Sequence, residues 1–228
     1  MFFFDSTIIL LLPAMLLALW AQFRVKRVFS KYSNVTAASG LTGAQAARRL
    51  LDANGLSAVT LEAAEGRLGD HYDPRSRVLR LSADTAGSRS VAAIGVAAHE
   101  VGHAVQHHRS YGAFTLRQAV LPLANFGSAA AFPLFFVGFL FAGSLPYLMD
   151  AGIILFAGAV LFHLVTLPVE LNASSRGLVL LSEQGQLAAE ERHMARRVLN
   201  AAALTYIAAA AVSVMHLLRL ILLRGMRD

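Results

Sequence analysis

Four long apolar segments alternate with two polar segments along this chain. The apolar segments cover residues 7–23, 120–143, 147–167 and 198–218. A helix of about 20 apolar residues matches the hydrocarbon core of a bilayer, so we predict a transmembrane helix for each segment. Only residues 144–146 separate the second segment from the third, which predicts a helical hairpin across the membrane. Basic residues follow the first segment rather than precede it, which favours an uncleaved anchor over a secretory signal peptide.

The two polar segments, residues 24–119 and 168–197, lie on the same side of the membrane if all four helices span it. They hold all but three of the 20 Lys and Arg residues. By the positive-inside rule this side is cytoplasmic. Arg224 and Arg227 near the C-terminus would then lie outside, which counts mildly against this topology.

The large polar segment shows patterns of helices and of a small sheet. Thr42 and Gln45 form a capping box and Gly55 is a stop signal, which predicts a helix over residues 44–53. Hydrophobic alternation at residues 59–61 and 77–81 predicts two strands, with residues 70–75 as the turn between them. Residues 91–108 predict a helix that is capped by Ser90 and is apolar on most sides, and therefore buried.

The composition agrees with a membrane protein. Hydrophobic residues make up 56% of the chain and charged residues 15%, against about 25% charged in soluble domains. The net charge of +6 follows from the distribution of Lys and Arg around the membrane, so it does not indicate a nucleic-acid partner. The chain has no cysteine, so any metal site must use His, Asp or Glu.

The buried helix over residues 91–108 carries the motif H-E-x-x-H. His99 and His103 are four residues apart, so they lie on one helix face and can hold one zinc ion. Glu100 is then close enough to take a proton from a water molecule at that site. Unpaired ionisable groups in a buried helix are costly, and a metal removes that cost.

A catalytic zinc site needs a third protein ligand and one open position. Glu170 is the best candidate, because it follows the third apolar segment directly and a carboxylate in apolar surroundings needs a partner. An ion pair with Arg176 is the alternative role for Glu170. His107 could extend the metal face, although cationic side chains commonly end helices in this way. The remaining candidates on this side are His71, His108, Asn172, Glu183, Glu190, Glu191 and His193.

Several strings of residues carry a family resemblance. They cover residues 1–5, 19–25, 40–43, 70–74, 91–107, 167–170, 173–174 and 201–206. In these strings the chain resembles the YugP-type membrane zinc metallopeptidases of bacteria, over nearly its whole length. That family is similar to the HtpX-type proteases, which are gluzincins, in the arrangement of its zinc ligands.

The resemblance implies zinc on His99, His103 and Glu170, with Glu100 catalytic. Gluzincins commonly place an Asp where this chain has Ser174, and YugP-type sequences usually carry an Asp where it has Asn172. Ser174 or Asn172 could then supply a weaker hydrogen bond to a zinc ligand.

We therefore expect a mainly α, multi-pass membrane protein with about four transmembrane helices and a cytosolic zincin-like α+β region containing a short β-hairpin or sheet. The expected parts are an N-terminal anchor (residues 1–23), a cytosolic region with the H-E-x-x-H helix (24–119), a transmembrane hairpin (120–167), cytosolic helices with the third ligand (168–197) and a C-terminal transmembrane helix (198–228).

The expected function is that of a zinc-dependent endopeptidase acting on peptides or membrane proteins. An extended substrate could pair with an edge strand at residues 78–82. His71, Tyr72 and Arg176 are open alternatives as a second oxyanion donor. The alternative function is a non-proteolytic zinc-binding scaffold or chaperone subunit, with a closed four-ligand site. A homo-oligomer or a membrane-protein partner is compatible with either.

Overall fold

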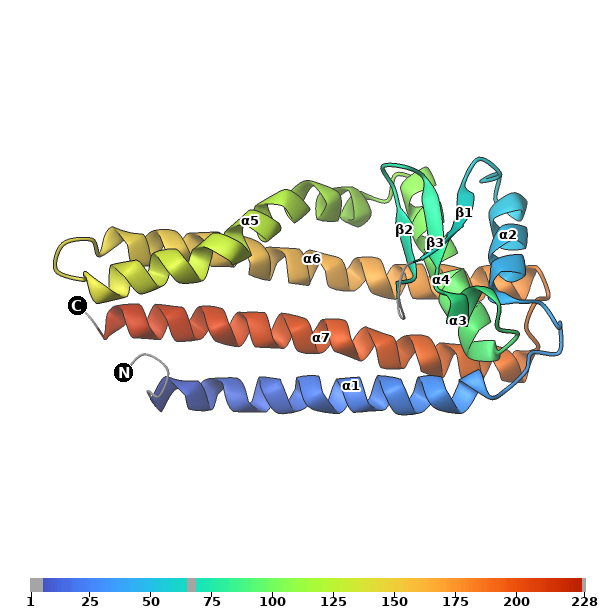
Figure 1. The fold of residues 1–228 in the computed structure, drawn as a ribbon, viewed down its shortest axis with the longest axis horizontal. Coiled ribbons are helices and arrows are strands. Elements are labelled where there is room, and N and C mark those ends of the chain that lie inside the picture. The colour runs from blue at the N-terminus through green and yellow to red at the C-terminus, as the bar shows by residue number, and fades with distance from the viewer. Residues whose placement is uncertain (1–5, 65–68, 227–228) are drawn as a thin grey trace. The chain divides into compact units, whose positions relative to one another are not determined.

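The computed structural model describes residues 6–64 and 69–226, and it is mainly helical with one small sheet (Figure 1). A short 3₁₀ helix (Ser6–Leu10) precedes α1. The helices are α1 (Leu11–Ser33), α2 (Gly43–Ala53), α3 (Ala83–Ala86), α4 (Val91–His108), α5 (Gly112–Leu140), α6 (Tyr147–Glu183) and α7 (Ala189–Gly225). The strands are β1 (Thr60–Ala63), β2 (His71–Asp73) and β3 (Val78–Leu81). Of the opening string used for the family resemblance, residues 1–5 lie outside the described residues.

Within the described residues, four helices are long and apolar enough to cross a membrane, which confirms the predicted fold class. They are Ser6–Ser33, Gly112–Leu140, Tyr147–Glu183 and Ala189–Gly225. All four extend well beyond the apolar segments into the polar ones. Low hydropathy marks where a helix leaves the hydrocarbon, whereas the backbone hydrogen bonding of the helix continues past that point. α6 ends only at Glu183, and Gly185, two residues later, has a φ of +60° and supplies the left-handed residue that commonly terminates a helix.

The chain divides into two compact units. One comprises Met1–Gln22, Thr115–Pro168 and Leu204–Asp228, and the other Phe23–Phe114 and Val169–Ala203. In the first unit, α5 and α6 pack closely at glycines. A Cβ on Gly152 would lie 2.7 Å from the Ala131 carbonyl oxygen, and one on Gly138 would lie 2.6 Å from the Met149 nitrogen. Small residues allow such close approach between membrane helices.

The second unit contains the sheet, whose strand order is β1-β3-β2. β1 pairs with β3 in parallel and β2 pairs with β3 antiparallel. Two expectations were therefore wrong. β2 occupies half of the predicted turn at residues 70–75, and the hairpin joins β2 to β3 around Arg77, which has a φ of +56°. β3 is the central strand and not an edge, since hydrogen-bonded neighbours flank it on both sides.

α4 forms the core of this second unit. Ser90 caps it by accepting a hydrogen bond from the Ala93 nitrogen at 3.2 Å, as predicted. The predicted capping box of α2 is also present, since the Thr42 hydroxyl accepts from the Gln45 nitrogen and the Gln45 side chain accepts from the Thr42 nitrogen. Apolar residues of α2, α4, β3 and α6 share one core, including Leu50, Leu51, Leu79, Ile94, Val101 and Leu181. This core fixes α4 and the motif that it carries.

Candidate metal centre

Glycines bring α4 against residues 169–183 of α6. A Cβ on Gly102 would lie 2.3 Å from the Ala173 carbonyl oxygen, and one on Gly177 would lie 2.6 Å from the Ala98 carbonyl oxygen. Real Cβ atoms do not approach backbone this closely, so only glycine fits at either place. The two helices are therefore in backbone contact beside His99 and His103, and Glu170 lies one turn before Ala173 on α6.

Three side chains converge at this helix crossing. Glu170 Oε2 lies 3.2 Å from His99 Nε2 and 3.5 Å from His103 Nε2. One potential ligand atom from each of His99, His103 and Glu170 lies within 4.8 Å of the others. Glu170 is 2% exposed and His103 is 7% exposed. Two imidazole nitrogens and a carboxylate oxygen form a ligand set that suits zinc where no thiolate is available, so these residues fit a metal ion.

A buried glutamine orients one of the imidazoles. His103 Nδ1 donates to Gln106 Oε1 at 3.0 Å, and Gln106 Nε2 donates to the Val169 carbonyl oxygen at 2.8 Å. The bond to Val169 fixes which end of the amide faces His103. Nδ1 therefore carries the proton, and His103 Nε2, which faces Glu170, keeps the lone pair that a metal requires. Gln106 is completely buried and was not among the sequence-predicted site residues.

Ser174 and Asn172, the two positions where the family resemblance leads one to expect Asp, both belong to this network. His99 Nδ1 lies 2.9 Å from Ser174 Oγ, so Ser174 can orient the second imidazole. Asn172 Oδ1 accepts from Gln106 Nε2 at 3.0 Å and from Arg176 Nε at 2.6 Å. The Arg176 guanidinium also lies over the Tyr111 ring, 5.7 Å from its centroid. Asn172 thus acts on His103 only through Gln106.

Glu100 is buried beside the three converging residues. It is 8% exposed, and its Oε2 accepts a hydrogen bond from the Tyr72 backbone nitrogen at 3.0 Å. Burial raises the pKa of the Glu100 carboxyl above its ordinary value, an effect that the neighbouring His99 only partly offsets. A carboxyl with a raised pKa is a better proton acceptor than an exposed one.

The other residues considered as ligands have different surroundings. His107 Nδ1 lies 2.9 Å from the Tyr72 hydroxyl, and the His107 ring stacks on Phe114. Burial lowers the pKa of His107 and raises that of Tyr72, so a neutral His107 accepts the phenol hydrogen. His71 is exposed, with Nδ1 2.7 Å from the Gly69 carbonyl oxygen. Among the described residues, the group that could hold a metal comprises His99, His103 and Glu170. His107 and His71 do not belong to this group.

Comparison with known proteins identifies the class. Residues 7–225 match the family model described as "Putative neutral zinc metallopeptidase", so the chain belongs to that family and the predicted resemblance is confirmed. The chain is similar to the "Putative membrane protease YugP" of Bacillus subtilis (strain 168). The two are 52% identical over 216 residues, which cover 95% of each chain. No solved structure matches this chain.

Proposed function

We propose that this protein is a membrane-embedded zinc-dependent endopeptidase, with the metal on His99, His103 and Glu170 and with Glu100 as the general base. The observation that carries the proposal is the convergence of two imidazoles and a buried carboxylate beside a second buried carboxyl group. Membership of a zinc metallopeptidase family supports the same assignment.

The chain's own residues provide the proton transfer and the positioning. Zinc, when bound, supplies a Lewis acid that polarises a peptide carbonyl and makes a water molecule more acidic. Glu100 accepts the proton from that water and then delivers it to the leaving amine. The Tyr72 backbone nitrogen holds the Glu100 carboxyl in place while it is charged. Ser174 and Gln106 keep the two imidazoles in the orientation that the metal requires.

The sheet suggests how a peptide is held. β2 is an edge strand, and its Tyr72 contacts Glu100, whereas β3 is in the centre. We infer that an extended substrate pairs with β2 through main-chain hydrogen bonds, in place of the predicted pairing at residues 78–82. His71, Tyr72 and Arg176 stay open as the second oxyanion donor, because the Tyr72 hydroxyl is paired with His107 and the Arg176 guanidinium is engaged by Asn172 and Tyr111.

The proposed site faces the cytoplasm, because the two polar segments carry nearly all the basic residues. The proposed organisation keeps the five segments 1–23, 24–119, 120–167, 168–197 and 198–228. A non-proteolytic zinc scaffold with a closed four-ligand site is not proposed, because His107, the residue that could extend the metal face, does not join the three converging side chains. His107 is instead hydrogen-bonded to Tyr72.

The direct test of Glu100 is the variant Glu100→Gln, assayed with fluorescent casein and a peptide library in proteoliposomes. We expect it to retain the zinc content of the wild-type protein and to lose at least about 100-fold in cleavage rate, the usual contribution of a general base. Glu183→Gln is the matched control, because Glu183 is exposed on α6. Undiminished cleavage by Glu100→Gln would refute the assigned role.

A further inference from the structure

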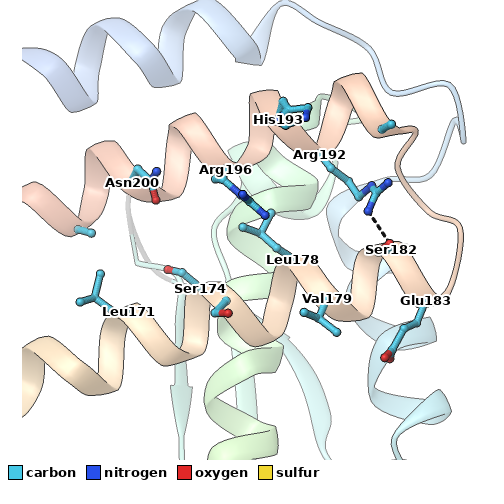
Figure 2. Close-up of a pocket in the computed structure, with 13 residues that line it drawn as sticks. Leu171, Ser174, Leu178, Val179, Ser182, Glu183, Arg192, His193, Arg196 and Asn200 are labelled. Carbon is cyan, nitrogen blue, oxygen red and sulfur yellow. Dashed lines mark hydrogen bonds between the residues drawn. The ribbon is translucent and has the colours of Figure 1, made fainter.

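A groove of about 520 Å³ runs between residues 171–183 of α6 and residues 189–203 of α7 (Figure 2). All residues that line it belong to the second unit. His99, His103 and Glu170 do not line it, although Ser174, which pairs with His99, does, so the groove adjoins the candidate metal centre without containing its proposed ligands. We propose that this groove binds the phosphate group of an anionic membrane lipid.

Two arginines give the groove its charge. Figure 2 shows Arg192 and Arg196 extending from α7 toward α6, across the groove. Arg192 donates to Ser182 Oγ at 2.5 Å, while its Nε is buried and has no hydrogen-bond partner among the described residues. Arg196 is exposed and forms no ion pair within the described part of the chain. Guanidinium groups that line a groove suit a phosphate, which can accept several N–H bonds at once, although the buried Arg192 Nε is not an accessible donor.

The balance of charge along the groove favours an anion. Glu183 is the acidic residue in the lining, and it lies at the C-terminal end of α6 beyond Ser182. Ser175 and Asn200 also line the groove and offer uncharged polar groups. The arginines outnumber the acid, and these two side chains provide further donors for phosphate oxygens.

The position of the groove along α7 points to a lipid as the source of the phosphate. Charged residues on α7 end at Arg197, and the next is Arg219, so residues 198–218 form the apolar stretch. The groove extends from Arg192 to Ala203 and therefore spans the transition from charged to apolar sequence. Leu171, which lines the apolar end, is 46% exposed. Basic pockets at this level, between membrane helices, bind anionic headgroups while neighbouring apolar side chains contact the acyl chains.

The test is a lipid titration of the full-length protein in detergent, followed by native mass spectrometry. Phosphatidylglycerol and phosphatidylcholine with identical acyl chains are compared, and glycerol phosphate is added as a soluble competitor. We expect the wild-type protein to bind phosphatidylglycerol at least about tenfold more tightly, since each arginine near a membrane surface contributes about fivefold. Equal affinity for the two lipids would overturn the proposal.

Variants locate the binding to the groove. Arg192→Gln combined with Arg196→Gln should lose most of the preference for phosphatidylglycerol. Arg49→Gln combined with Arg89→Gln, at two exposed arginines outside the groove, should keep it. Arg196→Glu alone preserves the Arg192–Ser182 bond and serves if the double variant does not fold.

The outcomes separate the possible ligands. Retention of the preference in a folded groove variant contradicts the site. Displacement of the lipid by glycerol phosphate at comparable concentration would identify a soluble phosphate as the ligand and overturn the lipid assignment. Because lipid binding is the readout, failure of the proposed peptidase activity would leave this result unaffected.

Discussion

Gly102 lies directly against the backbone of Ala173, so that a Cβ on Gly102 would be 2.3 Å from the Ala173 carbonyl oxygen. This contact sets the distance between the helix that carries the two histidines and the helix that carries Glu170. Because the obstructing atom belongs to the backbone, a side chain at residue 102 can be accommodated only if the helices separate.

We therefore expect Gly102→Ala to lower both stability and zinc content. Overpacking of this kind typically costs about 1–3 kcal/mol in the free energy of unfolding. Gly112→Ala is the matched control, because nothing lies within 4 Å of a Cβ at that position. Thermal unfolding and metal analysis of the purified variants measure both effects. Full zinc content in Gly102→Ala would show that the close approach is not needed for the site.

Gln106 is predicted to set the metal affinity through His103. Gln106→Met keeps the side chain length but removes the acceptor for His103 Nδ1, so the imidazole can rotate or change tautomer. Loss of such a partner typically lowers metal affinity by about 10–100-fold. Competition with a zinc chelator measures this change, with Gln184→Met in the exposed turn after α6 as the control. Unchanged zinc affinity in Gln106→Met would show that Gln106 does not set the metal affinity through His103.

The Tyr72–His107 pair predicts a dependence on pH. Burial lowers the pKa of His107 below its ordinary value of 6.5, with the positive charge of Arg77 acting in the same direction. Between the two pKa values the unfolded chain binds more protons than the folded protein. The stability is therefore complete above pH 6.5 and decreases as the pH falls through the folded-state pKa.

NMR titration of ¹⁵N-labelled histidines tests this expectation. The His107 ring should titrate below 6.5, and Tyr72→Phe should move its pKa upward, because the phenol hydrogen bond favours the neutral ring. Tyr111→Phe alters a different aromatic residue of the same unit and should leave the pKa of His107 unchanged. A His107 ring that titrates at or above 6.5 in the wild-type protein would contradict the expected effect of burial and of the Arg77 charge.

Local patterns predicted the helices well. Hydropathy located the four long helices, and capping residues located the starts of α2 and α4, because these signals act within a few residues of the chain. The pairing of His99 with His103 was likewise predictable from the pitch of one helix. The prediction that Glu170 lies near them came from its apolar surroundings and the family resemblance, and the close approach at Gly102 is the physical basis for it.

Tertiary contacts explain what the sequence did not predict. β2 has only three residues, and it is ordered by pairing with β3 and by the bond from Tyr72 to Glu100. Nothing in its own pattern distinguishes it from a turn. Gln106 was overlooked because its partner Val169 lies on α6, far away in the sequence. A polar residue one turn after His103, in a helix predicted to be buried on most sides, was the available signal.

The zinc content of Glu170→Ala tests the central claim most directly. We predict about one zinc ion per chain in the wild-type protein and in Glu183→Ala, which removes an exposed carboxylate from the same helix. Glu170→Ala should lose most of its zinc, because two imidazoles alone do not complete the site. Equal zinc content in Glu170→Ala and the wild-type protein would contradict the proposed metal centre.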